Sequence, residues 1–250
     1  MSRVRSLVLV AAARLPCTHC ARVALLLVLP CGEIGAAGWG GSLGFGSDVI
    51  QRGSSLTDGR PGWQADLRYA GANSWVVGIA ATAERPPGQH AGAQLTAYAD
   101  RRWRLAGNWS AKLGVVHYES PWNRWRPYLR YNELNAAIGW RGRWRLSLAV
   151  SPDSAGLTAD WHLRRGVVSH VETSWRQPLG ESWSAHAGAG YADLQRVAER
   201  AGAYASAGLV YAVGDVQIHS TLFWTDRGAQ AYATRPDLSL RWVNSLAWRF

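Results

Sequence analysis

Two histidines and their neighbours are the residues best suited to acid–base chemistry in this sequence. His170 and Glu172 lie two positions apart, so a β-strand would place both side chains on one face, where they can touch. A hydrolase would also need a nucleophile, and none is evident beside this pair. His117 with Ser120 is the other candidate grouping. The pattern favours a polar lining over catalysis, with a lipid or peptide hydrolase as the alternative.

Carboxylates and arginines also recur at matching positions early in the chain. Asp48 and Asp66 could face each other on adjacent strands, with Arg52 and Arg68 nearby. Two carboxylates beside two guanidinium groups are more often a structural ion-pair network than a catalytic acid–base pair. We therefore expect a structural ion-pair network here rather than acid–base catalysis.

Cysteines give no support to a metal or redox centre. The Cys17-Thr-His-Cys20 spacing has no second pair to complete a zinc or redox site. Cys31 follows Pro30, which fits the small-residue pattern of a lipidation site poorly. We expect no metal and no cofactor.

All three cysteines fall in an N-terminal segment that differs from the rest. Arginines precede an apolar run at 23–29, and small residues follow at 35–37. This order is typical of a secretory signal peptide, with cleavage after Ala37. The sequence thus predicts a leader at 1–37 and one mature domain at 38–250.

Composition narrows the class of that domain. The chain of 250 residues contains 27 Gly and 15 Trp, and Lys112 is the single lysine among 27 basic residues. After Pro30 no apolar run approaches the 18 residues of a membrane helix. Many aromatic residues with many glycines suit strands and turns better than helices.

The dominant signal past Gly38 is alternation with period two. For example, Trp63, Ala65, Leu67 and Tyr69 alternate with polar residues, which predicts a half-buried antiparallel strand. Counting residues 39–50 as the first strand gives twelve such segments in total. A thirteenth at 157–163 is the alternative. We place 153–165 in a loop instead, because this keeps the even count usual for membrane barrels.

The connections between these segments alternate in length. Short turns are expected near 71–74, 104–108, 141–143, 178–182 and 214–215, and long loops near 51–61, 85–91, 119–129, 153–165, 192–202 and 226–238. Short turns at one end and long loops at the other are typical of an outer-membrane barrel with periplasmic turns. The fold class predicted is all-β, a transmembrane antiparallel barrel of about twelve strands.

Aromatic side chains gather around the short turns. Their rings favour a membrane interface, because an apolar body meets lipid while the polar atom stays hydrated. A soluble sandwich core is the alternative explanation. The predicted interface girdle consists of Tyr69, Trp75, Trp103, Trp109, Trp140, Trp144, Trp175, Trp183, Trp248 and Phe250.

Positions between the apolar ones would face the inside of the barrel. They are polar and carry charges of both signs, as in a water-filled path or a plugged lumen. The predicted lumen-lining residues are Asp48, Gln64, Asp66, Arg68, Asp100, Lys112, Glu133, Arg145, His170, Glu172, His186, His219 and Arg241.

Clusters of Arg and Trp invite a nucleic-acid interpretation. Basic residues interleaved with aromatic ones bind single strands by phosphate contact and stacking. The clusters at 101–104 and 141–145 fall at predicted short turns, and a leader would export the chain away from nucleic acid. Anchoring at the lipid headgroups is the better explanation, and no nucleic-acid partner is expected.

The C-terminal stretch has the same alternation. Leu246, Trp248 and Phe250 would lie on one face of a strand. A last strand ending in Phe resembles the terminal signal that the assembly machinery of bacterial outer-membrane barrels reads. We expect that machinery as a partner, and expect this strand to pair with the first.

Several short motifs carry a family resemblance. The stretch 47–55, which contains Arg52-Gly53, and then Asp58-Gly-Arg-Pro61, resemble the opening of the TorF-type putative porin family. Residues 115–121 and 131–134 are supporting matches. The resemblance implies an outer-membrane, porin-like barrel without a firmly assigned substrate. Together with the mixed-charge lumen, it predicts a passive channel for small solutes, with a plugged structural barrel as a further alternative.

Overall fold

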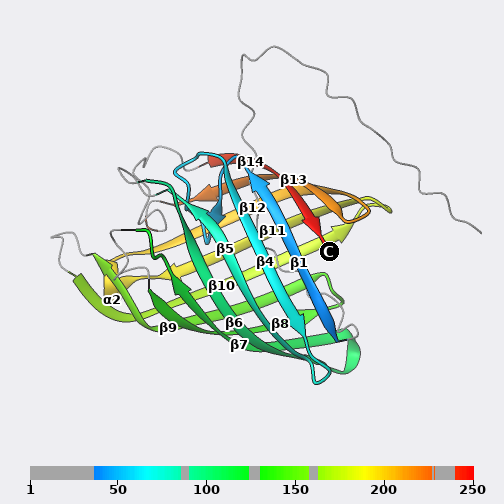
Figure 1. Cartoon of the computed structure of the whole chain (residues 1–250), viewed down its shortest axis with the longest axis horizontal. Helices are drawn as coiled ribbons and strands as arrows, with labels where there is room; N and C mark the ends of the chain where they lie inside the picture. Colours follow the sequence, from blue (N-terminus) through cyan, green and yellow to red (C-terminus); the bar gives the residue numbers. More distant parts are fainter. Residues whose placement is uncertain (1–36, 86–89, 124–129, 158–162, 227, 229–239) are drawn as a thin grey trace, which may run out of the picture.

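The protein, described by a computed structural model, is built almost entirely of strands (Figure 1). The structure describes residues 37–85, 90–123, 130–157, 163–226, 228 and 240–250. The predicted leader at 1–37 therefore lies almost wholly outside the described residues. Within the described part of the chain, no helix has the length and apolarity needed to cross a membrane.

The described residues contain twelve long strands and two short ones. The long strands are β1 (Gly38–Gly46), β4 (Gly62–Ala70), β5 (Trp75–Glu84), β6 (Gly92–Arg104), β7 (Trp109–Glu119), β8 (Tyr131–Trp140), β9 (Trp144–Leu157), β10 (Leu163–Pro178), β11 (Trp183–Asp193), β12 (Ala201–Val213), β13 (Val216–Thr225) and β14 (Leu240–Arg249). The short strands are β2 (Ile50–Gln51) and β3 (Ser54–Ser55), and the two short helices are η1 (Ala106–Asn108) and α2 (Gln195–Ala198).

The long strands form one closed antiparallel barrel in which chain neighbours are also sheet neighbours. Closure joins β14 to β1, with Ser42 opposite Arg249 and Gly46 opposite Ser245. This seam satisfies the edge groups that an open sheet would leave unpaired. The predicted fold class, strand number and pairing of the last strand with the first are confirmed.

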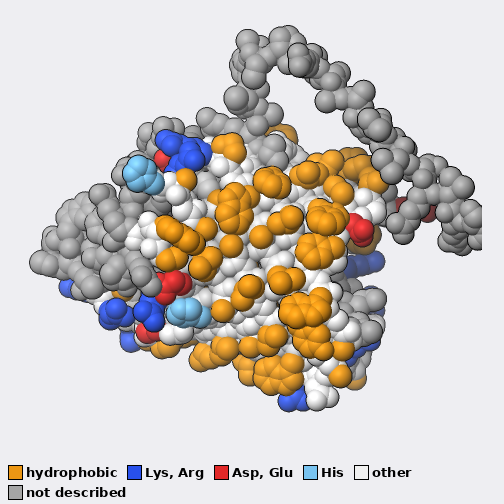
Figure 2. All heavy atoms as spheres, viewed as in Figure 1, with side chains coloured by type: hydrophobic (Ala, Val, Ile, Leu, Met, Phe, Trp, Pro, Cys, Tyr) orange, Lys and Arg blue, Asp and Glu red, His pale blue; other side chains and the backbone are white. Residues whose placement is uncertain are grey.

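Alternation along each strand separates two faces of the wall. On β5, Trp75, Val77 and Ile79 are exposed on the outside, whereas the intervening Val76 is buried. Figure 2 shows hydrophobic side chains spread over the outer wall of the barrel. The outer surface is thus apolar and the polar positions point inward, as the period-two pattern requires.

The five short turns lie at one end of the barrel, here called the short-turn end. They connect β4 to β5, β6 to β7, β8 to β9, β10 to β11 and β12 to β13. Gly38 at the start of β1 lies opposite Ala70, and Phe250 bonds to Gly41, so both strand termini lie at this end too. The strand ends that lead into the other connections lie at the opposite, long-loop end.

Two predicted boundaries were wrong. β9 and β10 continue their pairing to Leu157 opposite Leu163, so most of the predicted loop at 153–165 belongs to strands, and the connection between them spans only 158–162. The first strand ends at Gly46 rather than at 50, because the chain there leaves the wall and turns into the barrel. Asp48 is consequently a buried loop residue and not part of a strand.

Aromatic rings cluster on the outside of the short-turn end. Ring pairs form between neighbouring strands: Trp109 with Trp140 at 6.3 Å and Trp144 with Trp175 at 6.2 Å between centroids. The guanidinium of Arg101 lies over both Trp75 and Trp103. The rest of the predicted set at this end is Tyr69, Trp183, Trp248 and Phe250. The ring of Tyr69 also contacts Trp39, and the ring of Trp183 contacts Tyr211, two residues that the prediction omitted.

Candidate functional site

The most distinctive internal feature is a hairpin that folds into the barrel between β1 and β4. Strands β2 and β3 pair Ile50 with Ser55 and Gln51 with Ser54, leaving a two-residue turn. The turn residues Arg52 and Gly53 have φ angles of 49° and 77°. Two successive positive φ angles are what a tight type I′ hairpin turn requires, and Gly at the second position suits it.

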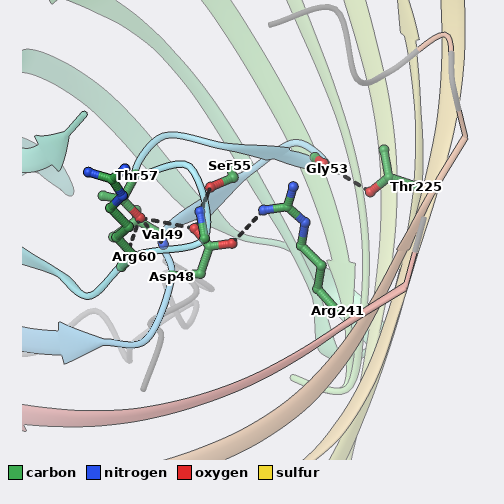
Figure 3. A network of polar contacts seen from close by, with 9 residues as sticks. Asp48, Val49, Gly53, Ser55, Thr57, Arg60, Thr225 and Arg241 are labelled. Atoms are coloured by element: carbon green, nitrogen blue, oxygen red, sulfur yellow. Dashed lines mark hydrogen bonds and ion pairs between the residues drawn. The ribbon is translucent and has the colours of Figure 1, made fainter. Parts of the chain in front are cut away.

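The base of this hairpin is fixed by a buried carboxylate. Asp48, 3% exposed, accepts a hydrogen bond from Thr57 Oγ1 at 2.9 Å and another from the Ser55 hydroxyl. Arg241 Nη1 on β14 donates to Asp48 Oδ2 at 2.7 Å. Figure 3 shows these side chains converging on Asp48. The carboxylate thus ties the hairpin to the strand that closes the barrel.

The tip of the hairpin reaches to the wall opposite. Arg52 Nη1 and Nη2 donate to the two carboxylate oxygens of Glu133 on β8, at 2.6 and 2.8 Å. Such a bidentate pair is both strong and geometrically specific. Burial lowers the pKa of the Arg52 guanidinium. The hydrogen bonds to Glu133, together with the electrostatic influence of Glu133, Tyr118 and Tyr131, more than offset this, so its pKa lies well above its usual range.

One side of the hairpin packs against the wall of β12, β13 and β14. Ile50 forms a buried apolar cluster with Phe223 and Val243. The carbonyl oxygen of Gly53 accepts a hydrogen bond of 2.9 Å from Thr225 Oγ1 (Figure 3). A Cβ atom on Gly53 would lie 2.7 Å from Cβ of Tyr204, so only glycine fits at this contact. Apolar packing and polar bonds together hold the hairpin in place.

On its other side the hairpin faces an internal cavity of about 250 Å³. The cavity is bounded by the hairpin and by the inner faces of β4 through β10. Of the predicted lumen-lining residues, those around it are Gln64, Asp66, Asp100, Lys112, Glu133, Arg145, His170 and Glu172. The arrangement leaves a polar compartment inside the barrel, narrowed by the Arg52–Glu133 bridge.

Two wall carboxylates of this compartment are neutralised by local pairs. Asp66 accepts a 2.7 Å bond from Arg68, two residues away on β4, and a 2.6 Å bond from the hydroxyl of Tyr98. Asp100 is held by Arg102 at 3.0 Å and lies 3.7 Å from Lys112. Asp66 and Arg68 thus form an expected ion pair, but Asp48 and Arg52 do not join it. They leave the wall with the hairpin and pair with Arg241 and Glu133 instead.

The candidate acid–base groups do not assemble into a hydrolase arrangement. Glu172 accepts a hydrogen bond from the hydroxyl of Tyr204, and His170 Nδ1 has no hydrogen-bond partner among the described residues. His117 lies on the outer face, bonded to Asn132 at 2.9 Å, whereas Ser120 is fully buried and donates to Glu84. These two residues point in different directions and cannot act together.

Other inward residues lie beyond the cavity. His186 and His219 face the lumen nearer the short-turn end, with ring centroids 6.4 Å apart. The predicted set omitted several side chains that face the lumen, although the same alternation predicts their direction. These are Tyr98, Arg102, Arg176, Tyr204 and Arg249, each flanked by outward-facing neighbours.

Comparison with known proteins identifies the architecture. The solved structure of NanC porin matches with a TM-score of 0.58 and 10% identity, over 84% of this chain and 99% of that chain. KdgM porin matches with a TM-score of 0.51 and 8% identity, over 84% and 99%. No family model and no curated protein sequence matches the chain, so the TorF-type resemblance stays a prediction. At these identities the comparison shows the fold: a closed all-β barrel of the kind found in two porins.

Proposed function

We propose that this protein is a channel that lets small solutes cross a bacterial outer membrane by passive diffusion. The observation that carries the proposal is a closed barrel whose outer face is apolar and whose inner face surrounds a polar cavity. A lipid-facing exterior with a hydrated interior is the design of transmembrane barrels. The structural likeness to porins supports the same function.

Orientation follows from the same design. The short-turn end would face the periplasm, with its aromatic girdle among the inner headgroups, and the long-loop end would face outward. Export would use the predicted leader at 1–37. The C-terminal strand and Phe250 would be read by the barrel-assembly machinery, and outer-membrane lipid would surround the wall.

The hairpin would set the size of the permeant solutes. It occupies the lumen beside a cavity of about 250 Å³ and is anchored at its base, side and tip. A polar lining with charges of both signs would give weak selectivity, and the excess of arginine would favour anions. No cofactor and no catalytic step are needed for this function.

Conductance of the refolded full-length protein in planar lipid bilayers tests the proposal. We expect small, stable current steps and entry of small sugars into liposomes, with heat-denatured protein as the control. A folded barrel that gives neither current nor solute entry would favour the plugged structural barrel. That alternative has support of its own, because the hairpin is bonded on three sides.

A further inference from the structure

A set of basic side chains lines the lumen at the short-turn end, away from the hairpin. Arg176 on β10 lies directly opposite His186 on β11, and His219 lies on β13. Arg249 on β14 and Arg68 on β4 lie near Ser42 and Gly40 of the intervening β1. We call these five residues the basic arc. It spans the seam of the barrel and follows half of its circumference.

Two guanidinium groups of the basic arc have no carboxylate partner in the part of the chain that the structure describes. Arg176 Nε donates to Ser184 Oγ at 3.2 Å, and no carboxylate of the described residues lies within ion-pair distance of Arg176 or Arg249. Arg249 is also repelled by Arg176 and Arg68. Like charges held together and partly withdrawn from water destabilise a fold unless something of opposite charge joins them.

Buried hydrogen-bonding groups beside these arginines are also unsatisfied. His186 Nδ1, His219 Nε2 and Ser245 Oγ have no partner among the described residues. His219 is 8% exposed and Ser245 is 2% exposed, and both alternate with outward-facing residues, so they point into the lumen. A buried polar atom without a partner in the protein is satisfied from outside it, by an ordered water molecule, an ion or a bound solute.

The described carboxylates that line the lumen are bonded to other side chains and do not pair with Arg176 or Arg249. Asp66 is already bonded to Arg68 and Tyr98, and Asp100 to Arg102. Glu133 and Glu172 face the hairpin and Tyr204. Among the described residues, Arg176 and Arg249 therefore carry inward positive charge at the short-turn end without a carboxylate partner, and both side chains are partly exposed.

We infer that the basic arc is a binding site for a small oxyanion, such as phosphate or a carboxylate. Arg176 and Arg249 would hold the oxygens by charge-assisted hydrogen bonds, and His186, His219 and Ser245 would supply their unused groups. The inference refines the proposed channel by naming the class of solute that pauses inside it. It places the selective site at the short-turn end, separate from the size limit set by the hairpin.

Calorimetric titration of inorganic phosphate into the folded full-length protein in detergent tests the site. Arg176→Gln with Arg249→Gln should weaken phosphate binding by at least about tenfold, since each substitution removes charge-assisted hydrogen bonds. The matched control is Arg101→Gln with Arg141→Gln, which removes the same charge from the outer side of the same end. Unchanged binding in the control and loss in the first pair are expected.

Equal binding by the Arg176/Arg249 variant and the wild type would overturn the inference. The inference would also be overturned if the wild-type protein bound no phosphate at about 10 mM, because a site with a higher dissociation constant would be too weak to select a solute. If the glutamine variant does not fold, Arg176→Lys with Arg249→Lys takes its place, because it keeps the positive charges and removes only the planar guanidinium fork. This variant should bind phosphate more weakly than the wild type.

Binding and flux separate this inference from the proposed function. Phosphate binding by a barrel that conducts nothing would refute the channel and keep the site. Conductance without phosphate binding, and without a change in the anion-to-cation permeability ratio in the Arg176/Arg249 variant, would refute the site and keep the channel.

Discussion

At the scale of single residues, Arg52 decides how the lumen is divided. Its side chain joins a loop to a strand 81 positions later in the chain, by two hydrogen bonds to Glu133. The carboxylate is 2% exposed and the guanidinium 17%. A pair so shielded from water fixes the position of the hairpin more firmly than a surface ion pair would.

Arg52→Gln should loosen the hairpin, because Glu133 then remains charged and buried without its partner. We expect a loss of about 3 kcal/mol, the lower end of the range for a broken buried pair because Arg52 is partly exposed. Single-channel recording should show a larger and noisier conductance. Arg52→Gln combined with Glu133→Gln should lose less than the sum of the single variants, and full additivity would contradict a direct bridge.

Gly53 offers a second test at this scale. Gly53→Ala adds a Cβ at 2.7 Å from Tyr204, on top of a backbone with φ of 77°. The left-handed conformation alone costs about 1–2 kcal/mol, and the clash adds to it. Gly142→Ala is the control, since its φ is 64° and no atom lies within 4 Å of the added Cβ. Thermal unfolding of both variants should show the larger drop for Gly53→Ala.

At the scale of elements, the seam between β1 and β14 is the shortest ladder of the barrel. It contains five paired positions, whereas ladders such as β4–β5 and β8–β9 contain seven. The cause is the early end of β1, whose chain leaves the wall to form the hairpin. Phe250 extends the seam, because its backbone exchanges hydrogen bonds of 2.8 and 3.2 Å with Gly41.

Removal of Phe250 should therefore impair insertion more than conduction. Two backbone hydrogen bonds, worth about 1 kcal/mol each, and the ring packed over Gly41 and Trp248 would be lost at the closing seam. The fraction of heat-modifiable, membrane-inserted protein measures the effect, with Phe250→Tyr as the control. An unchanged yield of inserted barrel would sink this prediction.

At the scale of the whole molecule, the barrel and the hairpin are separate structures. The barrel is one closed sheet, and β2 with β3 form a second sheet inside it. The short helix α2 also packs inward, with Val197 against Val168 and Ala192. The wall forms the closed sheet, while these inserted segments occupy part of its interior.

Replacing residues 50–55 with a Gly-Ser linker of equal length should leave the barrel intact and widen its lumen. The twelve-strand ladder makes no use of these residues, so heat-modifiable mobility should persist. Conductance should rise severalfold as the obstruction disappears. An unchanged conductance would show that another segment forms the narrowest part.

Much of the architecture could be predicted because period-two alternation is a local property. A residue such as Val77 or Asp66 faces outward or inward according to its place in its own strand, so strand number and wall faces follow from the sequence. The predicted inward positions Asp100, Glu133 and Glu172 accordingly surround one cavity. The ends of strands were less predictable, because alternation at 157–163 continues into a paired extension of β9 and β10.

Only the tertiary structure decided which charges meet. Asp48 and Arg241 are 193 positions apart, and their pairing depends on barrel closure and on the chain leaving the wall after Gly46. Arg52 in a polar loop carries no local signal that it points into a lumen and reaches Glu133. The sequence by itself determined a twelve-stranded barrel with an apolar exterior. Pairing across the lumen depends on register and closure, which bring together residues that no local pattern relates.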